Sequence, residues 1–157
     1  MKHSSNLLVD APAEKVGAIL ADLGTYPHWN DLVQAAQPDD SAADESDPEY
    51  APAWKTTLRA QVGPLARSKQ LRFVRVRDET ESTGSRTIRF ERDELDGREH
   101  AAWTMEARVL GVDSTSTEVT LTLSYTGGLW MPALGNVLSG AIERATNKLP
   151  AYVESRA

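Results

Sequence analysis

The stretch that decides the fold is TEVTLTLSYTGGLWMPALGNVLSGAIERATNKLPAYVE, residues 117–154. Its first part alternates apolar and polar side chains, and this period of two predicts a strand with one buried face. Two glycines end the strand, and an apolar stripe of helical period follows them. The stripe predicts a helix that begins between Leu129 and Pro132 and spans roughly 35 Å at 1.5 Å per residue. Pro150 predicts that the regular helix kinks or ends near Leu149.

Upstream of this stretch, alternation predicts further strands at 54–62, 66–77, 86–94 and 100–109. The pairs Gly63-Pro64 and Asp96-Gly97 predict turns between them. The apolar residues of 66–77 change face, which predicts a bulge or twist near position 73. Shorter strands are predicted at 6–9 and 32–36. Because consecutive strands joined by short turns pair as a meander, we expect one antiparallel sheet of about six or seven strands.

Two short helices are predicted between the first two strands. Pro12 suits the first turn of a helix, with Asp10 or Ala11 as its N-cap, and Gly24 suits its C-terminal end. The Tyr-Pro-His-Trp-Asn sequence at 26–30 predicts an aromatic turn or a second short helix. The predicted fold class is therefore α+β, with a curved antiparallel sheet wrapped around the long C-terminal helix. All 157 residues are expected to form a single domain.

The composition excludes several classes of site. The chain has no cysteine, which removes disulfides, thiolate catalysis and cysteine-based zinc sites. Its three histidines do not lie at metal-ligand spacing, so we expect no metal ion and no cofactor. The apolar run at residues 7–9 is too short for a signal peptide, and no run approaches the roughly 18 apolar residues of a membrane span. We therefore expect a cytoplasmic protein without an integral membrane segment.

The net charge of −6 is unevenly distributed along the chain. Residues 38–50 hold six acids and no base, so the rest of the chain sums to zero, and we expect this segment to be an exposed connection. Residues 67–77 hold five bases and no acid, but they alternate with apolar residues on a predicted strand. This placement and the low pI argue against a nucleic-acid partner. The oligomeric state stays open.

Three stretches carry a resemblance to a known family: VDAPAEKVGAILADLGTYPHWN at 9–30, FERDELDGREHAAWTME at 90–106 and LTLSYTGGLWMPALGNVL at 121–138. They resemble the START-like superfamily, also called the Bet v 1-like or polyketide cyclase/dehydrase and lipid-transport group. The resemblance implies the helix-grip fold, with an apolar hollow between sheet and helix. Relatives carry lipids, plant hormones, polyketide intermediates or quinones, and some act as cyclases or protein-binding modules. Many relatives have a large aromatic residue where this chain has Gly17, which either widens the hollow or allows a closer helix contact.

The candidate ligand-binding residues are inward positions of the predicted strands and of the final helix region. They are Trp54, Thr56, Leu58, Phe90, Arg92, Trp103, Met105, Tyr125, Trp130, Leu134 and Leu138. Ligand pockets are mostly apolar with a few polar groups, which Thr56, Arg92 and Tyr125 would supply. The alternatives are plain core packing for the aromatic residues, solvation for Arg92, and an exposed turn position for His28, the one candidate general base. We assign no catalytic residue.

The leading interpretation is a non-catalytic protein that binds or transports a small hydrophobic molecule, such as a lipid, a polyketide or a quinone. The second is an enzyme of the polyketide cyclase or dehydratase kind, in which one polar side chain moves a proton. The third is a protein-interaction module that uses the basic strand or the acidic segment. A solid core without a pocket would favour this third interpretation.

Overall fold

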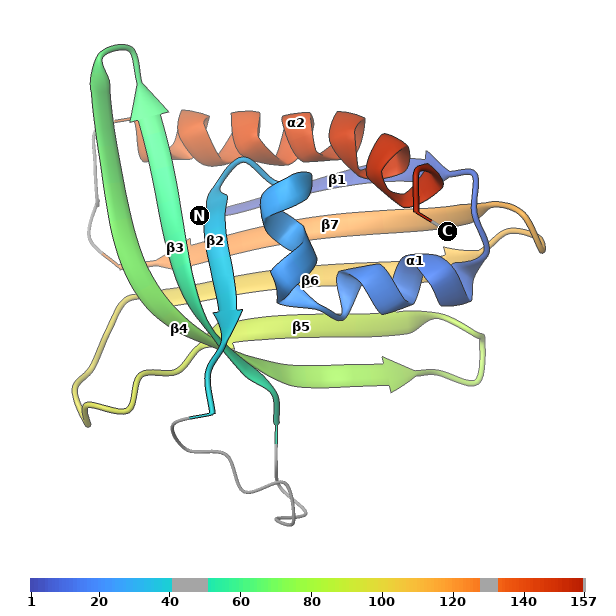
Figure 1. Ribbon diagram of the computed structural model, residues 1–157, viewed down its shortest axis with the longest axis horizontal. Helices are drawn as coiled ribbons and strands as arrows, with labels where there is room; N and C mark the ends of the chain where they lie inside the picture. Colours follow the sequence, from blue (N-terminus) through green and yellow to red (C-terminus); the bar gives the residue numbers. More distant parts are fainter. Residues whose placement is uncertain (41–50, 128–132, 157) are drawn as a thin grey trace.

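The computed structural model describes residues 1–40, 51–127 and 133–156, which form an antiparallel sheet of seven strands with helices on one face (Figure 1). In chain order the elements are β1 (Lys2–Val9), α1 (Ala13–Leu20), the 3-10 helix η1 (Leu23–His28), β2 (Val33–Pro38), β3 (Ala53–Val62), β4 (Leu65–Thr80), β5 (Arg86–Arg92), β6 (Ala102–Gly111), β7 (Thr117–Thr126) and α2 (Leu134–Glu154). The strand order across the sheet is β1-β7-β6-β5-β4-β3-β2. This is the predicted meander, with the first strand added beside the last.

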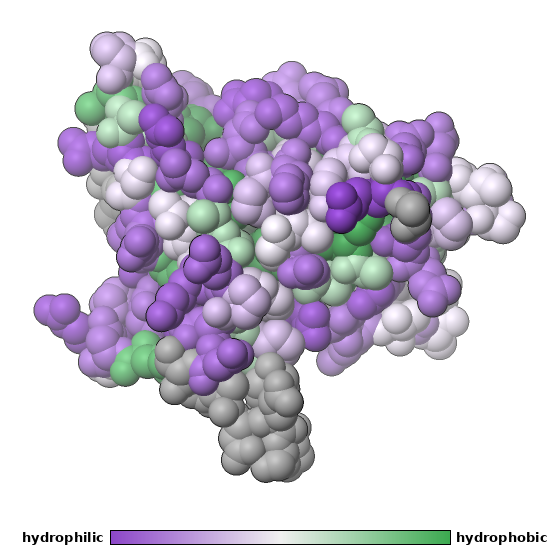
Figure 2. All heavy atoms as spheres, viewed as in Figure 1, coloured by the Kyte–Doolittle hydropathy of each residue, from purple (hydrophilic) through white to green (hydrophobic). Residues whose placement is uncertain are grey.

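The helices cover the inner face of the sheet. α2 packs along β1 and β7, α1 lies over β6, and η1 packs against β2. In β6 and β7 most inward side chains are buried and the side chains between them are more exposed, as the period of two predicted. The outward side of α2 is hydrophilic, which Figure 2 shows as a largely purple surface. The α+β class and the helix-grip arrangement are therefore confirmed.

The first helix is shorter than predicted. α1 has Pro12, rather than one of the two preceding residues, as its N-cap, and it ends at Leu20 rather than just before Gly24. Asp22 then starts a new helix, because its carboxylate accepts a hydrogen bond from the N–H of Gly24 at 2.9 Å. Asp side chains compete in this way with continuation of an α-helix. The second short helix that the aromatic turn predicted is this element, η1.

α2 runs to Glu154, as its apolar stripe predicted, and it continues through Pro150. Of the two alternatives for the proline, the end of the helix near Leu149 is therefore wrong. A proline inside a helix removes one backbone hydrogen bond and costs about 3 kcal/mol. Packing offsets this cost, because Leu149 and Val153 on either side of the proline are fully buried. The predicted start of this helix, between residues 129 and 132, lies outside the described residues.

The bulge predicted near position 73 lies slightly further along β4, where the register shifts between Arg75 and Arg77. Arg75 stays on the inner face, and its guanidinium donates a hydrogen bond to the carbonyl of Ala21 at 2.9 Å. Carbonyls at the C-terminal end of a helix have no partner within the helix. β4 therefore satisfies one of these acceptors at the end of α1.

Gly17 provides a closer contact between α1 and the sheet. A Cβ at this position would lie 2.5 Å from Nη1 of Arg86 on β5. That guanidinium is held by Asp78 through two hydrogen bonds of 2.7 and 2.8 Å. The hydrogen bonds from Arg86 also keep the pKa of Asp78 below its usual value. The missing side chain thus makes room for an ion pair rather than for a wider hollow.

The acidic segment is partly anchored in the sheet. The side chain of Asp39 is only 4% exposed, and its carboxylate accepts a hydrogen bond from Nε of Arg72 at 3.2 Å. The expectation of an exposed segment is therefore wrong for Asp39, because a base on β4 lies within reach of it. Asp40 is exposed as expected. Residues 41–50, which hold the other four acids, lie outside the described residues.

Candidate ligand-binding site

The structure places the described members of the predicted ligand-binding set on the inner face of the sheet and on the side of α2 that faces it. Eight of them are buried in one cluster: Trp54, Leu58, Phe90, Trp103, Met105, Tyr125, Leu134 and Leu138. The register puts Thr56 and Arg92 on the same inner face as their neighbours Leu71 and Phe73. Trp130 lies outside the described residues. Alternation along the strands thus separated the inner from the outer face correctly for every described member of the set.

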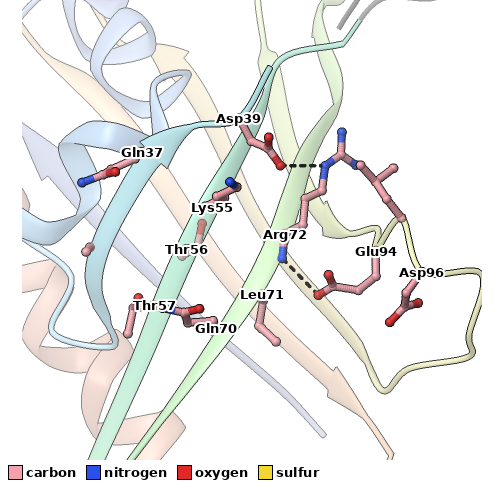
Figure 3. A pocket seen from close by; sticks show the side chains of 12 residues that line it. Gln37, Asp39, Lys55, Thr56, Thr57, Gln70, Leu71, Arg72, Glu94 and Asp96 are labelled. Carbon is pink, nitrogen blue, oxygen red and sulfur yellow. Dashed lines mark hydrogen bonds and ion pairs between the residues drawn. The ribbon is translucent and has the colours of Figure 1, made fainter. Parts of the chain in front are cut away.

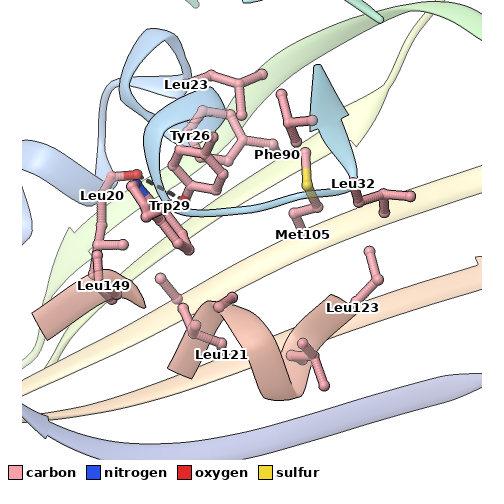
Figure 4. Packing of buried hydrophobic residues seen from close by; sticks show 14 of the residues in the cluster. Leu20, Leu23, Tyr26, Trp29, Leu32, Phe90, Met105, Leu121, Leu123 and Leu149 are labelled. Atoms are coloured by element: carbon pink, nitrogen blue, oxygen red, sulfur yellow. Dashed lines mark hydrogen bonds between the residues drawn. The ribbon is translucent and has the colours of Figure 1, made fainter. Parts of the chain in front are cut away.

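The interior between sheet and helices is closely packed. The Tyr26 ring of η1 lies 4.3 Å from Trp29 and 5.6 Å from Phe90, and the Trp54 ring lies 5.4 Å from Phe90, centroid to centroid. Figure 4 shows η1, the strands and α2 sending large side chains into this space. A hollow lined by Tyr26, Met105 and residues of β7 and α2 has a volume of about 20 Å³. That is room for about one water molecule, whereas ligand pockets occupy several hundred Å³.

Two hydroxyl groups of the interior differ in their hydrogen bonding. The Tyr26 hydroxyl donates to the carbonyl of Leu20 at 2.9 Å, and burial raises the pKa of Tyr26, so the phenol stays neutral. Thr56 Oγ1 is buried, and no group in the described parts of the chain forms a hydrogen bond with it. An unsatisfied buried hydroxyl costs about 1–3 kcal/mol. Thr56 is therefore the polar atom of the inner face that would gain most from a ligand.

Arg92 points inwards, and it already has partners within the protein. Its side chain is 7% exposed, and Nε donates to Oε1 of Glu94 at 2.9 Å. Its Nη1 also lies 3.4 Å from the carbonyl oxygen of Ala101. The same Glu94 oxygen accepts the backbone N–H of Arg72 at 3.1 Å. Arg92 is thus neither solvated nor an uncompensated charge, because Glu94 holds it at the point where β5 ends.

A cleft of about 570 Å³ opens between the end of β3 and the first half of α2. Its floor contains Leu32, Ala60 and Ala141, which all belong to the buried cluster. Its rim is polar and includes Arg59, Gln61, Asn136 and Arg144. The cleft exists because α2 packs chiefly along β1 and β7 and touches β3 at few places. It is the place where solvent approaches the apolar interior along the flank of α2.

Two ion pairs tie α2 to the far side of this cleft. Asp31 precedes β2, and its carboxylate binds Nζ of Lys148 at 2.6 Å and Nε of Arg144 at 2.9 Å. The hydrogen bond from Lys148, supported by Arg144, lowers the pKa of Asp31 below its usual value. All three side chains are at least a third exposed, so each pair contributes only modestly to stability. They form a weak link across the edge of the cleft.

A second hollow, of about 680 Å³, lies where the outer faces of β2, β3 and β4 meet the loop after β5 (Figure 3). Its lining includes the polar side chains of Gln37, Lys55, Thr57, Gln70, Glu94 and Asp96. The Asp39–Arg72 ion pair crosses it. This polar groove differs from the apolar cleft beside α2, and we do not place the hydrophobic ligand there.

His28 lies away from the interior. It is exposed at the end of η1, and its ring stacks on Tyr152 of α2 at a centroid distance of 5.3 Å. The alternative of an exposed turn histidine therefore fits its position. Across the described ranges, His, Asp and Glu side chains form no cluster of three that would hold a metal ion. No helix there has the length and apolar character needed to cross a membrane.

Sequence reasoning missed the residues of the cleft. Leu32 was expected only as part of a strand, and Ala60 and Ala141 only as members of apolar stripes. Their small or branched side chains carry no signal for a cleft, which arises from where α2 lies across the sheet. Asp31 and Arg144 also gave no signal, because 113 residues separate them in the chain.

Comparison with solved structures shows the same fold in proteins of low sequence identity. A START superfamily protein from Mycobacterium smegmatis has a TM-score of 0.69 at 17% identity, over 98% of this chain and 97% of that one. Human StAR-related lipid transfer protein 5 has a TM-score of 0.76 at 12% identity, over 98% and 75%. The Zhui aromatase/cyclase from Streptomyces sp. R1128 has a TM-score of 0.62 at 16% identity, over 99% and 94%. A comparison with curated protein sequences gives no significant match.

A family model described as polyketide cyclase / dehydrase and lipid transport matches residues 9–152. The match runs from the last residue of β1 into the final turns of α2, so it includes the cleft and the strands β2 to β7. The chain therefore belongs to the polyketide cyclase / dehydrase and lipid transport family, as its START-like sequence features predicted.

Proposed function

We propose that this protein binds a small hydrophobic molecule between α2 and the inner face of the sheet, and that it acts as a carrier rather than an enzyme. The observation that carries this proposal is the cleft beside α2, whose floor is made of buried core residues such as Leu32 and Ala141. A hydrophobic molecule that enters the cleft exchanges water for apolar contacts at about 25 cal/mol per Å².

The interior hollow holds only about 20 Å³, which is close to the solid core that would favour a protein-interaction module. Binding in this way therefore requires the interior to open. α2 packs mainly on β1 and touches β3 least, so its β3 side is the side that we expect to open. The exposed ion pairs of Asp31 resist this movement only slightly. A ligand admitted here would reach buried apolar residues such as Trp103 and Leu138, which favours a mainly apolar molecule.

Family membership supports this class of ligand. The family description names lipid transport and polyketide cyclisation, and the similar structures include a lipid transfer protein and an aromatase/cyclase. Lipids and aromatic polyketides are both mainly apolar with a few oxygen atoms. Between carriage and catalysis we choose carriage, because Arg92 is held by Glu94 and His28 stacks on the outside of α2.

Extraction of the protein purified from cells, followed by mass spectrometry, tests the proposal directly. We expect a lipid-like or polyketide-like molecule to copurify at a defined stoichiometry. Val137→Trp would fill the cleft and should weaken binding of that molecule by about tenfold or more, since an added large side chain competes for the same space. Val76→Trp on the exposed outer face of β4 is the matched control. Equal binding by both variants would contradict entry through the cleft.

Two further variants separate carriage from catalysis. His28→Gln and Arg92→Gln should change ligand affinity modestly, because neither side chain offers a positioned base. An enzyme that used one of them for proton transfer would lose about 10²–10⁴-fold in turnover while still binding its ligand. A substrate whose conversion collapses in either variant, with affinity intact, would replace the carrier proposal by the cyclase alternative.

A further inference from the structure

β4 is paired on both sides only at Phe73 and Val74. β4 pairs with β3 along its first part, from Leu65 to Val74, whereas β5 joins it only from Phe73 onwards. In Figure 1 the β3–β4 hairpin accordingly projects away from the rest of the sheet. Residues 66–70 of β4 pair with β3 but not with β5, although β4 lies between these two strands in the sheet. We call residues 66–70 the open edge.

The direction of the backbone groups at the open edge follows from Arg72. Its N–H donates to the carboxylate of Glu94, and its carbonyl accepts from the N–H of Asp93, so both groups point away from β3. Alternate residues of a strand direct their N–H and C=O to the same side. The backbone groups of Gln70, Ser68 and Ala66 therefore also point away from β3. Within the described ranges no residue forms a hydrogen bond with them.

The bases of the open edge also form no ion pair with the described residues. Three of the five bases at 67–77 have partners: Arg72 binds Asp39, Arg75 binds the carbonyl of Ala21, and Arg77 binds Glu79. The remaining two are Arg67 and Lys69, which have no carboxylate within ion-pair distance among the described residues. Burial, together with the nearby charge of Arg92, lowers the pKa of Lys69.

Arg67 and Lys69 lie on the same face of β4, two residues apart, opposite Ala60 and Leu58 of β3. An antiparallel strand placed against the open edge would set its own side chains beside them at the same spacing of two. We propose that the open edge binds an extended peptide segment of a partner protein, which adds as a strand and carries acidic residues at alternate positions. Main-chain hydrogen bonds to Ala66, Ser68 and Gln70 give affinity, and Arg67 and Lys69 give the preference for acids.

Charge also excludes a second copy of this chain as the partner. Antiparallel pairing of two open edges about Ser68 would place Arg67 of one copy opposite Lys69 of the other. Like charges directly opposite each other destabilise a strand pair. Basic side chains on a free edge are a known protection against indiscriminate strand pairing, and they leave an acidic strand as the permitted partner.

Fluorescence anisotropy with a labelled, end-capped peptide of alternating glutamate and threonine tests this inference on the full-length protein. We expect saturable binding that weakens by about tenfold or more in the Arg67→Glu/Lys69→Glu variant, because attraction becomes repulsion. The same variant should gain affinity for the peptide with lysine in place of glutamate. Lys2→Glu reverses an exposed base on β1, away from the open edge; this control should bind like the original chain.

A separate variant tests the main-chain hydrogen bonds that the added strand would form with the open edge. Ser68→Pro removes an N–H that points away from β3, so pairing with β3 loses no hydrogen bond while strand addition does. We expect about tenfold weaker peptide binding and an unchanged circular dichroism spectrum. Amide exchange at Ala66, Ser68 and Gln70 should slow when the peptide is added to the original chain.

Three results would overturn the inference. Equal affinity for the acidic and basic peptides would remove its charge basis. Unchanged binding by a peptide whose backbone is N-methylated at alternate residues would remove strand addition. Dimers of the original chain in sedimentation, lost in Ser68→Pro, would show that a second copy occupies the open edge instead. None of these outcomes depends on whether a hydrophobic ligand enters beside α2.

Discussion

Two regions of the same sheet have opposite character. In the closed region, made of β5, β6 and β7, each strand has a partner on both sides, and the inner faces of β6 and β7 are covered by helices. In the open region, the β3–β4 hairpin beyond Leu58 and Leu71, β4 lacks its second partner and α2 leaves a cleft. Alternating sequence is common to both. Pairing with adjacent strands and covering by helices, rather than the alternation of the strand's own sequence, therefore decide which side chains are buried in the core and which lie at the surface.

The largest expected contrast is between a buried aromatic residue and an exposed apolar one. Trp103→Ala should lower the free energy of unfolding by about 3–5 kcal/mol, because it removes buried contacts and leaves a void in the closed region. Leu65→Ala, at the tip of the open hairpin, should stay within about 0.5 kcal/mol. Urea denaturation with an unchanged m-value measures both. Similar losses in the two variants would show that the hairpin tip is part of the core.

Asp39 tests whether the open region is anchored by charge. Asp39→Ala should cost about 2 kcal/mol, because the poorly exposed Arg72 guanidinium loses a charged hydrogen bond and keeps only Asp93 as a partner among the described residues. Its neighbour Asp40 is exposed, so Asp40→Ala should change stability by less than about 0.5 kcal/mol. Thermal unfolding of the pair gives the comparison. If the two substitutions cost the same, the Asp39–Arg72 pair is not a structural link.

A substitution at Gly17 tests how closely α1 packs on the closed region of the sheet. Gly17→Phe should destabilise the protein by about 1–3 kcal/mol, because the ring must displace the Arg86 guanidinium from Asp78. Adding Arg86→Ala should recover part of the loss by providing space. A double-mutant cycle measured by chemical denaturation reports this coupling. Additive losses would mean that the ring finds space without moving Arg86.

The smallest effect is expected at the link across the cleft. Asp31→Asn should cost no more than about 1 kcal/mol, since the ion pairs with Arg144 and Lys148 are largely exposed. The pKa of Asp31 is lowered in the folded protein, so its contribution is present at neutral pH, above the unfolded pKa of about 4. It is lost as the pH falls through the lower folded pKa. Between about pH 5 and pH 2, the melting temperature of the variant should therefore fall less than that of the original chain. At pH 7, added salt should reduce the difference in melting temperature between the two proteins.

Much of the fold follows from sequence periodicity, with errors that have local causes. The strands at 54–62 and 86–94 were located within about two residues, because their alternation is regular and turn residues flank them. The end of α1 was misplaced, because the pattern extends past Leu20 although Asp22 diverts the backbone into η1. α2 runs to Glu154, as its apolar stripe predicted, because the packing of Leu149 and Val153 offsets the local cost of Pro150.

The candidate site was less predictable. Alternation identified which side chains face inwards, such as Trp103 and Tyr125, but it carries no information about whether the space between them is filled. The cleft depends on how far α2 lies from β3, which is a sum of many contacts with β1 and β7. The partners of Arg72 and Arg92 are likewise set by tertiary placement, so five bases in one strand could not be sorted into paired and unpaired from sequence alone.

The pairing of β1 with β7 has a consequence for folding kinetics. The side-chain oxygens of Ser4 and Thr122 lie 2.9 Å apart although 118 residues separate them, whereas every other strand pair joins neighbours in the chain. Closing so long a loop costs chain entropy before any contact is gained, so the meander from β2 to β7 should form first and β1 should dock afterwards. Leu7→Ala, which truncates a partly buried side chain of β1, should then accelerate unfolding and leave the refolding rate within about twofold in stopped-flow experiments. A matching slowdown of refolding would place the closure of the sheet in the transition state.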